Sequence, residues 1–286
     1  MIKAKKSLGQ NFLVDAGISQ RIVEQVGATR RDIIIEIGPG EGAITGLLLK
    51  TCGYLVAVEI DQRFIQILQS QFRGERFKLV AADALKIAWQ QLISEAIDEW
   101  KKLNADEKDF PGVRVVANLP YYISTPILER LLNLGNEISD LTLMLQEEVV
   151  DRITATPGNK EYGYLTVFVE YHAEATKLFR VSPQSFRPVP GVWSALLHLK
   201  IRKQPPVEVQ DNARFFALIR AAFAHRRKTI LNNLKSAAST LHFHSEILSA
   251  LKEADIEPQR RAETLSLKDF ERLYQALFTT MIRNPS

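Results

Sequence analysis

Three polar residues stand at the ends of short apolar runs and are the first candidates for chemistry in this sequence. They are Glu59, Asp83 and Asn118, and each of these runs has the composition of a buried strand. Parallel strands end at one edge of a sheet, and ligands bind in the crevice at that edge. We therefore expect the three side chains to line a binding site there.

A glycine-rich stretch, residues 38–42 (GPGEG), follows another apolar run at residues 33–37. Glycine carries no side chain, so such a stretch lets a ligand approach the backbone closely. Glu59 lies 19 residues beyond Gly40, a position that suits hydrogen bonds to two ribose hydroxyls. Asp83 could accept a hydrogen bond from an adenine amine, although helix capping would explain this residue equally well.

The glycine spacing also satisfies the fingerprint of dinucleotide-binding proteins, which makes a nicotinamide-dependent dehydrogenase an alternative. A pyrophosphate would sit at the start of the following helix, where Glu41 places an opposing negative charge. The cationic sulfonium of S-adenosylmethionine is compatible with that charge, so the loop favours this cofactor. A simple tight turn would explain the glycines but not the carboxylates beyond them.

The tetrapeptide Asn118-Leu119-Pro120-Tyr121 is the most informative site in the chain. An exocyclic adenine amine is a poor nucleophile because its lone pair is delocalised into the ring. The Asn118 side-chain oxygen and the Leu119 carbonyl could hold the amine hydrogens and aim the lone pair at a methyl group. Pro120 stiffens the loop and lacks an N–H, and Tyr121 offers a ring for an extruded base. Catalysis would then be mainly positioning, although an ordinary turn would explain the tetrapeptide in isolation.

The elements that must position these residues alternate between strands and helices, which predicts a doubly wound α/β sheet. Strands are expected at residues 33–37, 54–60, 77–82, 113–117, 141–146 and 194–201. Asp15 and Asp61 are expected to cap helices, and Ser266 with Asp269 forms a capping-box pattern before the last helix. The polar, proline-rich residues 203–206 place a domain boundary between 1–203 and a small helical domain, 204–286.

The basic excess of the chain is C-terminal. Residues 201–286 hold 14 basic and 9 acidic side chains, whereas residues 1–200 hold 23 and 24. Six basic side chains and no acid fall within residues 212–235. A helix through this stretch would place Arg220 and Arg227 on nearly one side, with Lys228 beside them. This pattern suits a polyanion such as RNA, although a solvated helix face would show the same charges.

Other features exclude whole classes of protein. Cys52 is the only cysteine and the five histidines lack metal-ligand spacing, so we expect no disulfide and no metal. The basic N-terminus is not followed by the apolar segment of a signal peptide. No apolar run approaches the ~18 residues that a membrane span requires. We therefore expect a cytoplasmic protein without membrane contact.

Four segments together closely resemble the ribosomal RNA adenine dimethyltransferases. They are residues 5–13 (KKSLGQNFL), 36–42 (EIGPGEG), 118–126 (NLPYYISTP) and 223–230 (FAHRRKTI). The likeness runs from Lys5 to about Leu277. It implies a Rossmann-like methyltransferase domain with a small all-helical C-terminal domain. It also implies S-adenosylmethionine as donor and two adjacent adenosines near the 3′ end of small-subunit rRNA as acceptors.

The resemblance also implies roles for individual residues. The cofactor contacts that it implies are Asn11, Leu13, Gly38, Glu59, Asp83 and Asn118. Phe186 matches an aromatic residue expected to sandwich the target base with Tyr121, although a core position would also explain it. We expect RNA contacts from Arg220, Arg226, Arg227 and Lys228. The expected partner is the small ribosomal subunit or its precursor, bound by a monomer. Trp193 and His225 depart from the family pattern.

Two other interpretations of the function stay open beside dimethylation of small-subunit rRNA. A methyltransferase of the antibiotic-resistance type would act on large-subunit rRNA, but such relatives usually carry isoleucine before the proline, where this chain has Leu119. A non-catalytic RNA-binding or assembly factor could keep the fold, but the intact pocket residues argue against it. The interpretation that we favour is dimethylation of small-subunit rRNA.

Overall fold

The computed structural model describes residue 5 and residues 9–105 and 112–278, and the chain divides into two compact units. Unit 1 comprises Met1–Val150 and Ala173–Lys203, and unit 2 comprises Asp151–His172 and Gln204–Ser286. The division after Lys203 lies at the expected proline-rich boundary. Residues 151–172, however, belong to unit 2, which the sequence did not predict.

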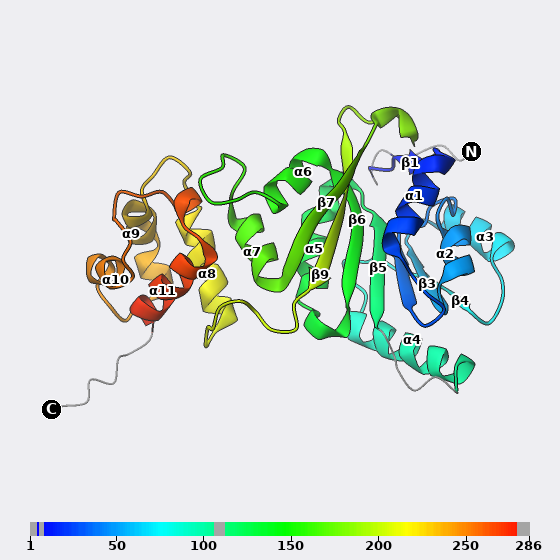
Figure 1. The fold of residues 1–286 in the computed structure, drawn as a ribbon, viewed down its shortest axis with the longest axis horizontal. Helices are drawn as coiled ribbons and strands as arrows, with labels where there is room; N and C mark the ends of the chain where they lie inside the picture. The colour runs from blue at the N-terminus through cyan, green and yellow to red at the C-terminus, as the bar shows by residue number, and fades with distance from the viewer. Residues whose placement is uncertain (1–4, 6–8, 106–111, 279–286) are drawn as a thin grey trace. The chain divides into compact units, whose positions relative to one another are not determined.

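Unit 1 is built on a seven-stranded sheet in the order β4-β3-β2-β5-β6-β9-β7 (Figure 1). The strands are β2 (Ile33–Ile37), β3 (Tyr54–Glu59), β4 (Phe77–Ala81), β5 (Val113–Asn118), β6 (Asp140–Gln146), β7 (Ala173–Val181) and β9 (Ser194–Ile201). The first five in this order are parallel, and β9 runs antiparallel between β6 and β7. The predicted doubly wound sheet is confirmed. Strand β7 escaped prediction because its polar residues follow no clean alternation.

Two short strands, β1 (Phe12–Leu13) and β8 (Phe186–Arg187), form a separate antiparallel pair. Phe12 pairs with Arg187 and Leu13 pairs with Phe186. This pair fixes the N-terminal segment to a segment more than 170 residues further along the chain.

The helices and 3-10 turns of the first part of the chain separate these strands. They are α1 (Ala16–Val26), α2 (Thr45–Thr51), α3 (Gln62–Gln71), α4 (Trp89–Leu103), η2 (Tyr121–Ile123), α5 (Ser124–Leu132), η3 (Gly135–Glu137), α6 (Glu147–Ile153) and η4 (Pro183–Ser185). Asp15 caps α1 by accepting from the Ile18 N–H at 3.1 Å, as predicted. Ile22 and Leu48 from two helices pack with Ile34 of β2 in one buried cluster. The central strand is thus covered by helices, which is why its residues are uniformly apolar apart from Glu36.

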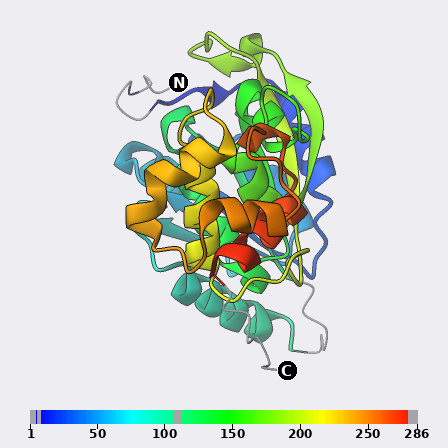
Figure 2. The same cartoon turned by 90° about the vertical axis from the view of Figure 1, so that its left-hand side faces the viewer.

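Unit 2 is helical, with α7 (Tyr164–His172), α8 (Asn212–Ala222), α9 (Ile230–Leu241), α10 (Ile247–Glu253), η5 (Ala262–Thr264) and α11 (Leu267–Phe278) (Figure 2). The Phe168 ring lies 4.9 Å from that of Phe216, and the Tyr171 hydroxyl donates to Asn212 Oδ1 at 2.8 Å. These contacts join α7 to α8 and explain why residues 151–172 belong to unit 2. Within the described parts of the chain, every helix lacks the length and apolarity needed to cross a membrane.

The helix expected through residues 212–235 is interrupted. α8 ends at Ala222, and α9 begins after Thr229, whose side chain accepts from the Asn232 N–H at 3.3 Å. The buried Asn233 donates from Nδ2 to the carbonyls of Ala222 at 2.7 Å and His225 at 3.2 Å. The side chain of Asn233 thus supplies a donor to the Ala222 carbonyl that a continuous helix would have satisfied, whereas the His225 carbonyl also accepts from the Lys228 N–H at 3.0 Å.

This interruption corrects the expected placement of the basic residues. Arg220 lies in the last turn of α8, whereas Arg226, Arg227 and Lys228 lie in the connection to α9. Arg220 and Arg227 therefore do not share one helix face.

Candidate functional site

Two cavities that share part of their lining lie at the carboxyl ends of the parallel strands. The first, about 360 Å³, is lined by Gly38, Glu59, Asp83 and Asn118, which follow or end four different strands. The second, about 330 Å³, is lined by residues that include Leu13, Glu36 and Met144. Phe12, Gly38, Gly40 and Asn118 line both. Asn11 also lines the first, so the fold brings all six expected cofactor residues to these cavities.

The glycine loop leaves open space beside its backbone. Gly38 has φ +66°, a conformation that favours glycine, and a Cβ atom built there would meet nothing within 4 Å. Its N–H donates to the Val58 carbonyl at 2.9 Å. A Cβ at Gly40 would instead lie 3.3 Å from the Phe12 ring. The loop is therefore held close to β3 and β1 and can admit a ligand at Gly38.

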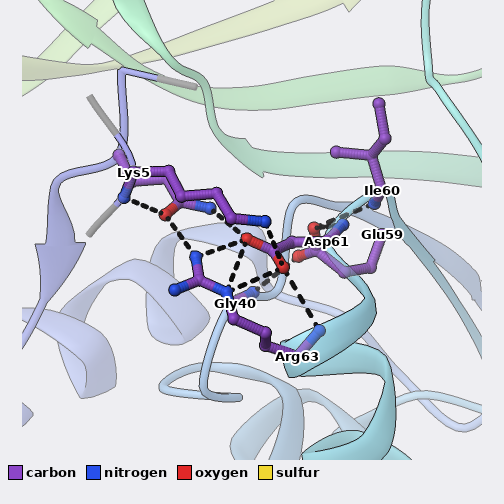
Figure 3. A network of polar contacts seen from close by, with 7 residues as sticks. Lys5, Gly40, Glu59, Ile60, Asp61 and Arg63 are labelled. Atoms are coloured by element: carbon purple, nitrogen blue, oxygen red, sulfur yellow. Dashed lines mark hydrogen bonds and ion pairs between the residues drawn. The ribbon is translucent and has the colours of Figure 1, made fainter. Parts of the chain in front are cut away.

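Glu59 is a buried carboxylate whose orientation is set by the backbone. Its Oε1 accepts from the N–H groups of Ile60 and Asp61, both at 2.8 Å, and its Oε2 accepts from the Gly40 N–H at 3.1 Å (Figure 3). Burial raises the pKa of Glu59, and these three hydrogen bonds oppose that rise. The result is a fixed acceptor on the wall of the first cavity.

Asp61 joins the N-terminal segment to the start of α3, a role that the sequence did not indicate. Its side chain caps α3, as predicted, by accepting from the Arg63 N–H at 3.2 Å. It also forms ion pairs with Arg63 Nη2 at 2.6 Å and with Lys5 Nζ at 3.3 Å, and Gln10 Nε2 donates to it at 3.2 Å. Figure 3 shows the side chains of Lys5 and Arg63 converging on this carboxylate. The hydrogen bonds from Arg63, above all, hold the pKa of Asp61 well below its usual range.

Asn118 is anchored to the same N-terminal segment. Its Nδ2 donates to the Asn11 carbonyl at 3.1 Å, and the Leu119 N–H donates to the Met144 carbonyl at 3.2 Å. Pro120 and the exposed Tyr122 both line the first cavity, and Tyr122 was not predicted as a site residue from the sequence. Tyr121 lies in η2, but its side chain is outside what the structure describes.

Asp83 combines the two roles considered for it. Its Oδ1 accepts from the Leu85 N–H at 2.9 Å, so the carboxylate closes the turn after β4. The side chain is still 29% exposed and lines the first cavity, with Lys86 Nζ 4.0 Å from Oδ2. One carboxylate oxygen thus serves the turn while the group stays accessible to a ligand.

Glu36 is a second buried acid at the site, and its place there was not predicted from the sequence. Thr45 Oγ1 donates to its Oε2 at 2.7 Å, whereas Oε1 is buried without a hydrogen-bond partner in the described structure. Burial raises the pKa of Glu36 to about 8, and the charge of Glu59 adds to the rise. A carboxylate inside the apolar run of β2 was the available signal. Among the described residues, no group of His, Cys, Asp or Glu side chains is arranged to hold a metal ion.

Phe186 occupies a different place from the one expected of a base-stacking residue. It is 1% exposed and belongs to the buried cluster that contains Leu13, its partner across the β1–β8 pair. Its ring therefore presents no free face to a base in this conformation. The alternative given for Phe186 from the sequence, a position in the core, agrees better with this burial.

The basic residues of unit 2 differ in their surroundings. Arg226 Nε pairs with Glu263 at 3.1 Å, and its Nη2 donates to the Lys160 carbonyl. The Arg220 guanidinium lies 4.7 Å from the centre of the Tyr164 ring. Arg227 and Lys228 are exposed. An acid from a distant part of the chain thus offsets part of a charge run that looked unopposed in the sequence.

Comparison with known proteins decides the family of this chain. The profile of the ribosomal RNA adenine dimethylase family matches residues 1–278. This chain belongs to that family. It is 44% identical to the ribosomal RNA small subunit methyltransferase A of Shouchella clausii, covering 97% of this chain and 90% of the relative. A protein of the same name from Geobacter metallireducens is 43% identical, with 96% of each chain covered.

Solved structures agree with the family. A dimethyladenosine transferase from Plasmodium falciparum has a TM-score of 0.71 and 25% identity, covering 92% of this chain and 95% of that one. The 23S rRNA methyltransferase ErmE shares the fold, with a TM-score of 0.65, 23% identity and coverage of 93% and 99%. The fold is thus that of Rossmann-like rRNA methyltransferases, and the family assignment makes the protein an S-adenosylmethionine-dependent rRNA adenine dimethyltransferase rather than a dehydrogenase.

Proposed function

We propose that this protein methylates two adjacent adenosines near the 3′ end of small-subunit rRNA, giving N6,N6-dimethyladenosine. Relatives at 42–44% identity bear the name small subunit methyltransferase A, which supports the small subunit as target. The observation that carries the proposal is the position of Asn118, which lines both cavities, with Leu119 and Pro120 after it on the wall of the first. We propose that the protein acts as a monomer on the small subunit or its precursor, in the cytoplasm.

The first cavity has the donor and acceptor groups that the nucleoside of S-adenosylmethionine requires. Glu59, oriented by three backbone N–H groups, would accept hydrogen bonds from both ribose hydroxyls. The accessible carboxylate of Asp83 would accept from the adenine amine. The open space at Gly38 would admit the methionyl part beside Asn11 and Leu13.

Asn118 would prepare the target amine for methyl transfer. Because its Nδ2 is engaged by the Asn11 carbonyl, its Oδ1 is the atom left to accept an amine hydrogen. The Leu119 carbonyl would accept the second hydrogen, so that the lone pair points at the methyl carbon. When bound, S-adenosylmethionine supplies that methyl group on a positively charged sulfur, whose neutral thioether is a good leaving group. The protein would thus act by orientation rather than by strong acid–base chemistry.

The remaining site residues would hold the RNA. Tyr121 would stack on the extruded base, and Pro120 would keep the loop stiff. Phe186 would support β1 from the core. Exposed Arg227 and Lys228 would contact phosphates, together with Arg220 and Arg226.

The proposal is tested by incubating the protein with labelled S-adenosylmethionine and undermethylated small subunits, then mapping the modified bases. We expect label only in dimethyladenosine and its monomethyl precursor. Asn118→Ala should lower the single-turnover rate much more than RNA affinity, because the amide aligns the amine and does not dock the RNA. Methylated cytosine or methylated ribose would contradict the proposal, as would a parallel incubation in which large subunits are labelled and small subunits are not. Binding without any methyl transfer would indicate an assembly factor.

A further inference from the structure

Trp193 is the one tryptophan of the chain that lies open to solvent. The sequence has three, and Trp89 and Trp100 are 3% and 1% exposed, whereas Trp193 is 44% exposed. It ends the connection between β8 and β9, in which Val189 and Val192 are also exposed, at 52% and 45%. Exposed apolar residues gathered in this way mark an interaction site more often than a solitary exposed side chain does.

The indole of Trp193 is held in place by charged groups. The Arg180 guanidinium lies 4.4 Å from the ring centre, a cation–π arrangement. Arg180 Nε is itself paired with Glu147 Oε1 at 2.6 Å, and the Trp193 carbonyl accepts from the Glu147 N–H at 3.0 Å. One face of the ring is thus backed by a fixed cation. The exposed fraction of the side chain remains available for contact.

The carboxylate that holds Arg180 also binds a second cation. Lys177 Nζ shares Glu147 Oε1 with Arg180 at 2.7 Å, so two cations meet one carboxylate. Exposed Arg187, the last residue of β8, directly precedes this connection and lies opposite Phe12 in the β1–β8 pair. Phe12 lines both cavities, so the connection is attached directly to the wall of the methyl-transfer site. A planar aromatic ring among cations is complementary to an unpaired nucleotide, which combines a flat base with a phosphate.

We infer that Trp193, backed by Arg180, is a stacking platform for an unpaired base of the RNA substrate outside the methyl-transfer cavity. The inference rests on the proposed function in that the bound macromolecule is RNA. A docking site for another protein is the competing occupant. Such a site would use the apolar area of Val189, Val192 and Trp193 together, whereas stacking depends on the indole ring alone.

Fluorescence of the full-length protein gives a direct test. Because the other two tryptophans are buried, emission that acrylamide can quench reports mainly on Trp193. A short single-stranded RNA with unpaired adenosines should quench this component and shield it from acrylamide. A fully paired duplex of the same sequence should do so much less, because its bases are already stacked on one another. RNA affinity, followed in parallel by anisotropy of labelled RNA, shows that binding has occurred.

Three variants separate stacking from apolar docking. Trp193→Ala should weaken binding of the single-stranded RNA by a factor of about 5 to 150, the range for loss of one stacked base. Trp193→Phe keeps an aromatic ring and should restore most of the affinity. The matched control Val192→Ala should bind RNA as the wild type does. Cofactor affinity should stay the same in all three.

The possible failures are distinct. If the wild type binds and methylates RNA but Trp193 emission does not respond, the platform is refuted and the proposed function stands. Equal quenching by the duplex, or equal loss of affinity in Val192→Ala and Trp193→Ala, would also refute stacking. If the wild type neither binds nor methylates RNA, the platform and the proposed function fail together.

Discussion

Two buried carboxylates at the same sheet edge are held in different ways. Glu59 receives three backbone hydrogen bonds, so its negative charge is supported despite burial. Glu36 receives one from Thr45 and leaves its other oxygen buried without a hydrogen-bond partner in the described residues. The first is suited to binding a ligand as an anion, whereas the second favours its protonated form near neutral pH.

Replacement of Glu59 should affect the cofactor and not the RNA. We expect Glu59→Ala to weaken S-adenosylmethionine binding by about 1.5–3 kcal/mol, the scale of hydrogen bonds to a charged group. Isothermal calorimetry measures the cofactor affinity, and anisotropy measures RNA affinity. Glu75→Ala, at an exposed position, is the matched control. Unchanged cofactor affinity in Glu59→Ala would remove this residue from the ribose site.

Glu36 should make the stability of the free protein depend on pH. Its folded-state pKa of about 8 lies above the ordinary value of 4.5, so the folded protein binds the proton more tightly than the unfolded chain does. The stability that the folded protein gains by holding this proton on Glu36 is therefore fully present below about pH 4.5. It is lost as pH rises toward 8. Glu36→Gln has no titrating group at this position, so its stability does not fall in this way. The free energy of unfolding of the variant minus that of the wild type should therefore increase by about 2–4 kcal/mol from pH 5 to pH 8. Urea unfolding at several pH values measures the difference, which would stay constant if Glu36 were charged throughout.

At the scale of the element, the break between α8 and α9 decides how the basic residues are presented. Asn233 satisfies the carbonyls of Ala222 and His225 where the helix would otherwise continue. The connection thereby carries Arg227 and Lys228 together on an exposed turn. Arg226 in the same turn is engaged with Glu263 and Lys160. We therefore expect phosphate contact first from Arg227 and Lys228.

Removing these two charges should alter RNA binding and its salt dependence. Arg227→Gln with Lys228→Gln should leave the fold and cofactor affinity intact while weakening binding to the small subunit. The log–log slope against salt should become shallower by about one to two units, since each phosphate contact contributes roughly 0.7–0.9. Lys268→Gln, at an exposed position of α11, serves as the control. Wild-type affinity and slope in the double variant would mean that the RNA surface lies elsewhere.

At the scale of the whole molecule, the two units carry different features. All residues that line the two cavities belong to unit 1. The aromatic packing around Phe216 and the basic turn belong to unit 2. The chain passes from one unit to the other after Val150 and returns at Ala173 before it leaves again after Lys203. Each unit is therefore built from two separate stretches of the chain.

Cofactor binding should protect unit 1 selectively. A ligand that binds only the folded state stabilises it by about 2.7 kcal/mol when its concentration is a hundred times Kd. Hydrogen–deuterium exchange with saturating S-adenosylmethionine should show slower exchange at residues 9–13, 38–42 and 59–61. Exchange in α9, α10 and α11 of unit 2 should hardly change. Equal protection in both units would contradict a site confined to unit 1.

The sequence by itself determined the features that depend on neighbouring residues. The apolar runs predicted six of the seven strands of the main sheet. Because Glu59, Asp83 and Asn118 lie at the ends of three of these runs, their place at one edge of the sheet was predicted as well. Asp15, Asp61 and the Ser266–Asp269 pair cap helices as predicted, because capping uses residues within one turn. Resemblance over several long motifs indicated the family.

Only the tertiary structure decided what depends on residues far apart in the chain. Lys5 and Gln10 reach Asp61 across 56 and 51 residues, and β8 meets β1 across a longer separation. Phe186 is buried because that strand pair places it on the core cluster, and residues 151–172 join unit 2 because Phe168 and Tyr171 pack on α8. Glu36 is a candidate site residue because β2 lies between β3 and β5 and because Glu36 lines the second cavity. Burial and long-range contact set these outcomes, and neither is encoded in local spacing.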